Sequence, residues 1–116
     1  MNKAVTTFCL SLMLLAGAAA VADDPLTIRI YNDNAEAIVV SVYDMNAQPP
    51  EAVVANQRIN GFAWIAVSVA AGAVGKAHVT WVARNVDSSF HSCGSQEMHG
   101  VSNDALVSVS VDSSCR

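Results

Sequence analysis

The sequence of 116 residues has few charged side chains and few aromatic ones. Charged residues make up 14% and aromatic residues 6% of the chain, whereas 53% are hydrophobic. This composition excludes intrinsic disorder, which requires low hydrophobicity and high net charge. Beyond the N-terminal segment, no apolar run reaches the roughly 20 residues that a membrane-spanning helix needs. The sequence therefore predicts one small globular domain without a membrane span.

The N-terminus has the three-part pattern of a secretory signal peptide. A short cationic start precedes an apolar stretch, which is followed by small residues ending in Ala20-Val21-Ala22. This order predicts cleavage after Ala22, so that 1–22 is a signal peptide and 23–116 is a single all-β domain. We therefore expect an exported protein, either periplasmic or secreted.

Basic residues are also scarce. Loss of Lys3 with the signal leaves five basic residues against ten acidic ones, a formal charge of −5. Nucleic acids and anionic membranes both select proteins with a basic surface. The sequence therefore argues against nucleic acid, and the expected partner is a protein, a glycan or another envelope component.

Cysteine is limited to three residues. Cys9 leaves with the signal, and Cys93 and Cys115 remain. An even number of cysteines in an exported chain indicates a disulfide, and here only one pairing exists. In the chain-entropy model, closing this loop stabilises the fold by about 3 kcal/mol.

Leucine is nearly absent from the mature part, which has two Leu but fifteen Val and five Ile. Such β-branched residues favour pleated strands over helices. Alternation of apolar and polar residues predicts strands over 26–31, 37–45, 52–59, 62–70, 76–86 and 105–111. Six or seven strands and one disulfide predict a small antiparallel β-sandwich of immunoglobulin-like size. A closed β-barrel is the alternative.

Two turns carry specific expectations. Asn60-Gly61 is typical of a two-residue type I′ turn, which predicts that strands 52–59 and 62–70 pair directly as a hairpin. Asn32-Asp33-Asn34, together with Glu36, offers oxygen ligands for calcium, although the spacing matches no calcium loop. Ordinary turn chemistry, in which Asx side chains bond the nearby backbone, is the preferred interpretation.

The stretch 87–104 shows no periodicity but holds His91, Cys93, Met98 and His99. It resembles the ligand loop of blue-copper proteins, which places Cys, His and Met between the last two strands of a β-sandwich. Here Met98 precedes His99, and Cys93 is expected in the disulfide. The preferred interpretation is a polar loop without a cofactor, and the alternative is a periplasmic copper site formed by His91, Met98 and His99.

Catalytic motifs are absent from the sequence. There is no Gly-x-Ser-x-Gly elbow, no His-Glu-x-x-His motif and no phosphate loop. We therefore expect no enzyme but a binding or interaction module that uses loops or a sheet face. Tyr43, which alternates away from the apolar side of its strand, and Arg58, beside the Asn60-Gly61 turn, are the candidate partner contacts.

Overall fold

The computed structural model describes residues 24–89 and 92–112. Seven strands are found in these residues: β1 (Leu26–Asn32), β2 (Ile38–Asp44), β3 (Glu51–Ile59), β4 (Trp64–Val69), β5 (Ala77–Asn85), β6 (Gly94–Val101) and β7 (Leu106–Val109). The chain is all-β over this part, as predicted. Within it, no helix has the length and apolar character to cross a membrane.

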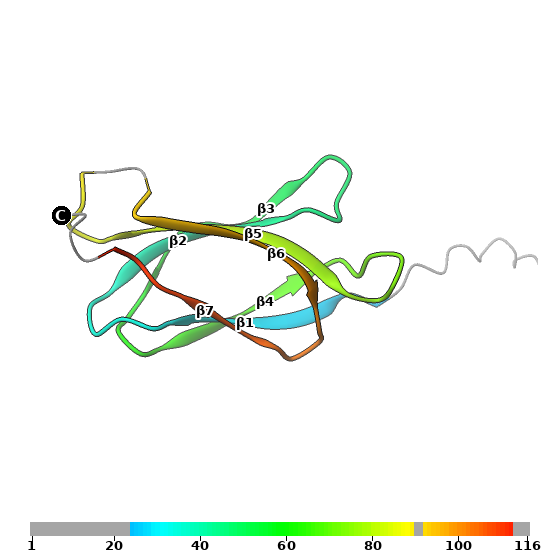
Figure 1. Cartoon of the computed structure of the whole chain (residues 1–116), viewed down its shortest axis with the longest axis horizontal. Coiled ribbons are helices and arrows are strands. Elements are labelled where there is room, and N and C mark those ends of the chain that lie inside the picture. Colours follow the sequence, from blue (N-terminus) through cyan, green and yellow to red (C-terminus); the bar gives the residue numbers. More distant parts are fainter. Residues whose placement is uncertain (1–23, 90–91, 113–116) are drawn as a thin grey trace, which may run out of the picture.

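The strands form two sheets that face each other as two layers (Figure 1). The order is β4-β1-β7 in the three-stranded sheet and β3-β2-β5-β6 in the four-stranded sheet. The architecture is therefore a sandwich, and the closed barrel is not observed. One expectation was wrong: β7 pairs with β1 in parallel, so the sheets are not wholly antiparallel. Parallel pairing needs a long connection, and the whole chain between these two strands provides it.

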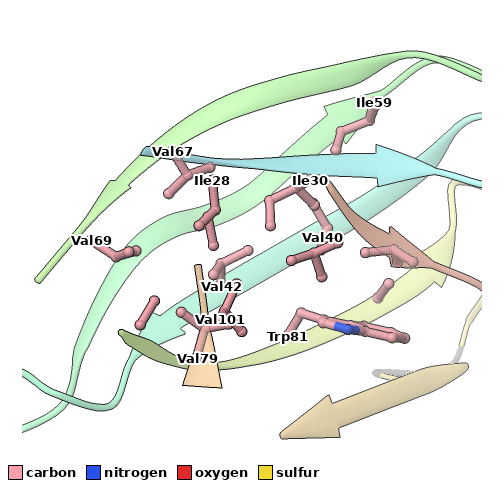
Figure 2. Packing of buried hydrophobic residues seen from close by; sticks show 14 of the residues in the cluster. Ile28, Ile30, Val40, Val42, Ile59, Val67, Val69, Val79, Trp81 and Val101 are labelled. Atoms are coloured by element: carbon pink, nitrogen blue, oxygen red, sulfur yellow. The ribbon is translucent and has the colours of Figure 1, made fainter. Parts of the chain in front are cut away.

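In the described part of the chain, one hydrophobic core lies between the two sheets (Figure 2). It is built from the apolar side of each alternating strand, and Ile28, Ile30, Val40 and Val42 are completely buried. The inward residues of strands β1, β2, β5 and β7 are those that alternation predicts. The remaining core members are Ile38, Ile59, Val67, Val69, Ala77, Val79, Trp81, Ala83, Val101, Val107 and Val109.

The connection between β3 and β4 differs from the predicted hairpin. β3 belongs to the four-stranded sheet and β4 to the three-stranded one, so the chain crosses between layers at Asn60–Ala63. The positive φ of this turn falls on Phe62 (56°). Gly61 is required for a different reason: a Cβ there would lie 2.0 Å from the Ala35 carbonyl oxygen. Tertiary contact with Ala35, rather than a type I′ conformation, explains the glycine.

The buried side chain of Asn32 holds this crossover in place. Its Nδ2 donates to the carbonyl oxygens of Ile59 (3.0 Å), Asn60 (3.0 Å) and Glu36 (2.8 Å). Its Oδ1 accepts hydrogen bonds from the backbone N–H and the Nδ2 of Asn34. The Asx-rich turn therefore uses these two amides to connect β1 to the end of β3, in agreement with the preferred turn interpretation.

At the far end of β2, the buried carboxylate of Asp44 connects the two layers a second time. Its Oδ2 accepts from the backbone N–H of Ala70 at 2.8 Å, and its Oδ1 accepts from that of Asn46 at 3.1 Å. Ala70 directly follows β4, which belongs to the other sheet. Buried polar groups persist when they are hydrogen-bonded, and here they tie the sheets together.

The stretch 87–104 contains a strand that alternation does not reveal. β6 is an edge strand of the four-stranded sheet, paired with β5 alone. Its residues are mostly exposed, and its hydrophobic residues Met98 and Val101 are the ones that pack against or within the core. The expectation of a polar loop over 94–101 was therefore wrong.

The predicted disulfide joins Cys93, which precedes β6, to Cys115, which lies outside the described residues. The signal peptide of residues 1–22 lies outside them as well. Both assignments stay predictions.

Candidate binding sites

The outer side of the three-stranded sheet carries an exposed aromatic surface. Tyr31 on β1 pairs with Trp64 on β4, and Arg29 on β1 pairs with Leu106 on β7. All four side chains alternate away from the buried residues of their strands. Trp64 is 52% exposed and Leu106 is 50% exposed. We call Arg29, Tyr31, Trp64 and Leu106 the Trp64 face.

Arg29 orders the centre of the Trp64 face. Its guanidinium lies over the Trp64 ring, 5.7 Å from the ring centroid, and its Nη2 donates to the carbonyl oxygen of Asp104 at 2.9 Å. A cation over an indole is attracted by the π-system. Of the outward residues on the three strands of this sheet, Arg29 alone is charged. The surface thus combines exposed aromatic and aliphatic side chains with one fixed positive charge.

The outer side of the four-stranded sheet carries a different group, two imidazoles and one carboxylate. Nε2 of His78 on β5 lies 2.6 Å from Oε2 of Glu97 on β6, and Nε2 of His99 lies 3.4 Å from the same oxygen. The two imidazole rings stack with centroids 4.0 Å apart and an interplanar angle of 26°. One ligand atom from each residue lies within 4.8 Å of the others. We call these three residues the His78 cluster.

Strand alternation and a β-bulge build the His78 cluster. Glu97 and His99 are two residues apart on β6 and project to the same side, while Met98 between them packs against the core. The register shifts between the pairs Val79–Met98 and Ala77–Val101, so β6 has one extra residue opposite His78. Gly100 occupies this bulge with a φ of 65°, which suits glycine. The bulge returns Val101 to the core after His99 has pointed outward.

The residues of the predicted copper site do not share one side of the sheet. Met98 contacts the hydrophobic core, whereas the His99 side chain is 71% exposed and stacks on His78 on the outer side. His91 lies outside the described residues. The structure thus places His99 beside His78 and Glu97, a grouping that the sequence did not predict. Met98 points away from this group.

The two predicted partner contacts lie on the four-stranded sheet. Tyr43 is half-buried on its outer side, in a row with Thr80 and Glu97 on the next two strands. Arg58 is exposed on β3 and lines a hollow of about 310 Å³ together with Glu36, Asp87 and neighbouring residues. Both residues are accessible at least in part, and their contact with a partner stays a prediction.

Sequence reasoning missed the Trp64 face and the His78 cluster for separate reasons. Trp64 alternates with Ile65 and Val67, which marks it as outward, but a large aromatic residue in a strand is more often buried. Glu97 and His99 have the i, i+2 spacing of one strand face, yet no strand was predicted there. Recognition of the polar edge strand β6 would have placed both beside the outward His78.

No family model, curated protein or solved structure matches this chain.

Proposed function

We propose that the mature chain is a small exported β-sandwich that binds a protein partner through the Trp64 face and has no catalytic activity. The observation that carries this proposal is the exposure of Trp64: a tryptophan that is 52% exposed, on the edge strand β4 of a sheet face with one charged residue. Tryptophan, tyrosine and arginine dominate the binding energy of protein interfaces. All three occur here on adjacent strands.

The Trp64 face is also ordered before a partner arrives. The indole has a cross-strand neighbour in Tyr31 and a guanidinium over its ring, and that guanidinium is itself hydrogen-bonded to Asp104. Side chains that are already ordered lose less conformational entropy when they bind. Arg29 already covers one face of the Trp64 ring, which leaves less of the ring for a stacked sugar, and we therefore propose a protein and test a glycan as the alternative.

The absence of catalysis is supported by the setting of the titratable groups. His78, Glu97 and His99 lie on the outer side of a sheet, and none of them lines the hollow beside Arg58. Enzymes act in concave sites that exclude water and hold the substrate. The His78 cluster offers no such enclosure.

The proposal also includes export of the protein and a disulfide between Cys93 and Cys115. The backbone N–H of Asp112 donates to the carbonyl oxygen of Cys93 at 2.9 Å. Cys115 follows Asp112 by three residues. Three residues of chain are long enough to allow the roughly 5.5 Å between the Cα atoms of Cys93 and Cys115 that a disulfide requires. This proximity supports the pairing of Cys93 with Cys115 in an oxidising compartment.

Site-specific photo-crosslinking tests the proposed function. A benzophenone amino acid is introduced at Ala66, which is exposed beside Arg29, or at Ser95, which is exposed on the opposite side of the sandwich. We expect a discrete cross-linked protein from position 66 in envelope extracts, and loss of that product when Trp64→Ala is added. With the purified partner, Trp64→Ala should weaken binding by about 30-fold, equivalent to roughly 2 kcal/mol.

Two outcomes would contradict this assignment. Cross-links from Ser95 but not from Ala66 would move the interface to the four-stranded sheet, where Tyr43→Ala and Arg58→Ala would then be the informative variants. Binding to a glycan array that is lost in Trp64→Ala would replace the protein partner with a carbohydrate.

A further inference from the structure

The His78 cluster has the composition of a transition-metal site. Two imidazole nitrogens and one carboxylate oxygen form the ligand set found at open zinc sites, where a fourth position is left to water or to a substrate. Calcium and magnesium prefer sets made of oxygen alone. A thiolate, which would favour copper(I), is not among the three residues.

The geometry of the cluster is close to what a metal requires. Bonds of about 2.0–2.2 Å in tetrahedral geometry place ligand atoms about 3.3–3.5 Å from one another. In the cluster, the two distances from Glu97 Oε2 to the histidine Nε2 atoms are 2.6 and 3.4 Å, and all three ligand atoms lie within 4.8 Å. Side-chain rotations that move these atoms by about one ångström are enough to bring all three onto one ion.

The backbone beneath the cluster is fixed. His78 lies on a regular strand between two buried residues, and Glu97 and His99 lie on the strand that is hydrogen-bonded to it. The Nε2 atoms of both histidines already face the same carboxylate oxygen. A metal ion would bind the Nε2 lone pair of each imidazole and the Glu97 carboxylate, three groups that the fold already holds together.

From this arrangement we propose that His78, Glu97 and His99 bind one divalent transition-metal ion of the zinc(II) or copper(II) class. The net charge of the chain is negative, which attracts a cation to its surface. The site differs from the copper site predicted for residues 91–99, because it uses His78 and Glu97 and leaves out Met98. It also lies on the opposite sheet from the Trp64 face, so either proposal can fail without the other.

Calorimetric titration with zinc chloride, and separately with a copper(II) salt, tests the proposal on the exported protein purified without a histidine tag. We expect one metal equivalent to bind. Removal of an outer-shell group alone costs about 10–100-fold in metal affinity, so loss of a direct ligand in His78→Ala, Glu97→Gln or His99→Ala should cost at least tenfold.

Two matched controls separate this site from the alternative. His91→Ala removes the remaining histidine of the chain, and Met98→Leu removes the thioether, while both leave the three proposed ligands in place. We expect both variants to bind like the wild type. Circular dichroism and thermal melting of each metal-free variant show whether it is folded, and His78→Gln and His99→Gln replace any alanine variant that is not.

The proposal is overturned if the wild-type protein binds neither metal at one equivalent. It is equally overturned if binding survives His78→Ala and Glu97→Gln but is lost in His91→Ala or Met98→Leu. In the first case the cluster is only a cross-strand polar contact, and in the second the metal belongs to the 91–99 segment.

Discussion

The two outer sides of this sandwich differ in chemistry although they cover the same core. The three-stranded sheet presents Tyr31, Trp64 and Leu106 with the single charge of Arg29. The four-stranded sheet presents the His78 cluster, in which two imidazoles face one carboxylate. The first side carries the aromatic residues through which we propose that a protein binds, and the second carries the three proposed ligands of a metal ion.

This difference follows from the alternation of strand residues, whose inward side chains build the core and whose outward side chains form the two surfaces. Each inward position is set by the shared core, so a change there affects both sheets. Each outward position contacts only its own neighbours, so one side can change while the other stays constant. The two surfaces are therefore expected to respond together to changes in the scaffold and separately to changes in exposed side chains.

The largest effect is expected from Gly61→Ala, which disturbs the crossover between the sheets. A Cβ 2.0 Å from the Ala35 carbonyl oxygen forces the backbone to move. We expect the free energy of unfolding to fall by more than about 3 kcal/mol, as in severe overpacking, and both surfaces to be lost together. Urea denaturation measures this loss.

Gly75→Ala is the matched control. Gly75 has a φ of 74°, but a Cβ there meets nothing within 4 Å. The substitution should lower the free energy of unfolding by about 1 kcal/mol, which is the cost of placing a residue with a Cβ in the left-handed conformation. An equal loss in both variants would contradict the role given to the Ala35 contact.

Reduction of the proposed disulfide is expected to have the next largest effect. In the chain-entropy model it lowers stability by about 3 kcal/mol, which corresponds to a Tm decrease of roughly 12–24 °C in a domain of this size. Thermal melting with and without a reductant gives the shift. Two free thiols in the exported protein, detected by thiol titration, would show that the bond is absent.

Asp44→Ala should destabilise the sandwich by about 2 kcal/mol, because it leaves the backbone N–H groups of Ala70 and Asn46 without their buried acceptor. Asp33→Ala, at an exposed position, is the control and should change stability by less than about 0.5 kcal/mol. Chemical denaturation of both variants measures the difference. Equal losses of stability in the two variants would show that Asp44 does not help to hold the sheets together.

The regular strands could be predicted from the sequence because their two sides differ. In β5, Val79 and Trp81 alternate with His78 and Thr80, and burial follows that pattern. β6 could not be predicted in this way, because Gln96, which pairs with the buried Trp81, is polar and exposed, and the bulge at Gly100 shifts the alternation before Val101. Edge position alone does not remove the pattern, because the edge strands β4 and β7 alternate regularly.

The crossover and the sites depend on contacts that are distant in sequence. Asn60-Gly61 is locally a hairpin signal, and only the packing of Gly61 on Ala35 and the hydrogen bonds from Asn32 show its actual use. The His78 cluster likewise joins residues about twenty positions apart through the β5–β6 register. Local patterns carry no information on such pairings.

The smallest effects on stability are expected from Trp64→Ala and His99→Ala, at positions that are half or more exposed. His99→Ala should change the free energy of unfolding by about 0.5 kcal/mol or less, and Trp64→Ala by about 1 kcal/mol, because it also removes the pair with Tyr31 and the contact with Arg29. Trp64→Ala should remove partner capture and leave metal binding intact, whereas His99→Ala should do the reverse. Crosslinking and calorimetry on both variants check this, and loss of both activities in either variant would show that the surfaces are coupled.

The most direct test of two separate surfaces is a zinc titration of the tag-free protein followed by amide and indole NMR. We predict that shifts are confined to residues around His78, Glu97 and His99, and that the Trp64 indole and Tyr31 amide signals stay unchanged. Shifts that extend to Trp64, or the absence of any shift at a saturating zinc concentration, would contradict the account.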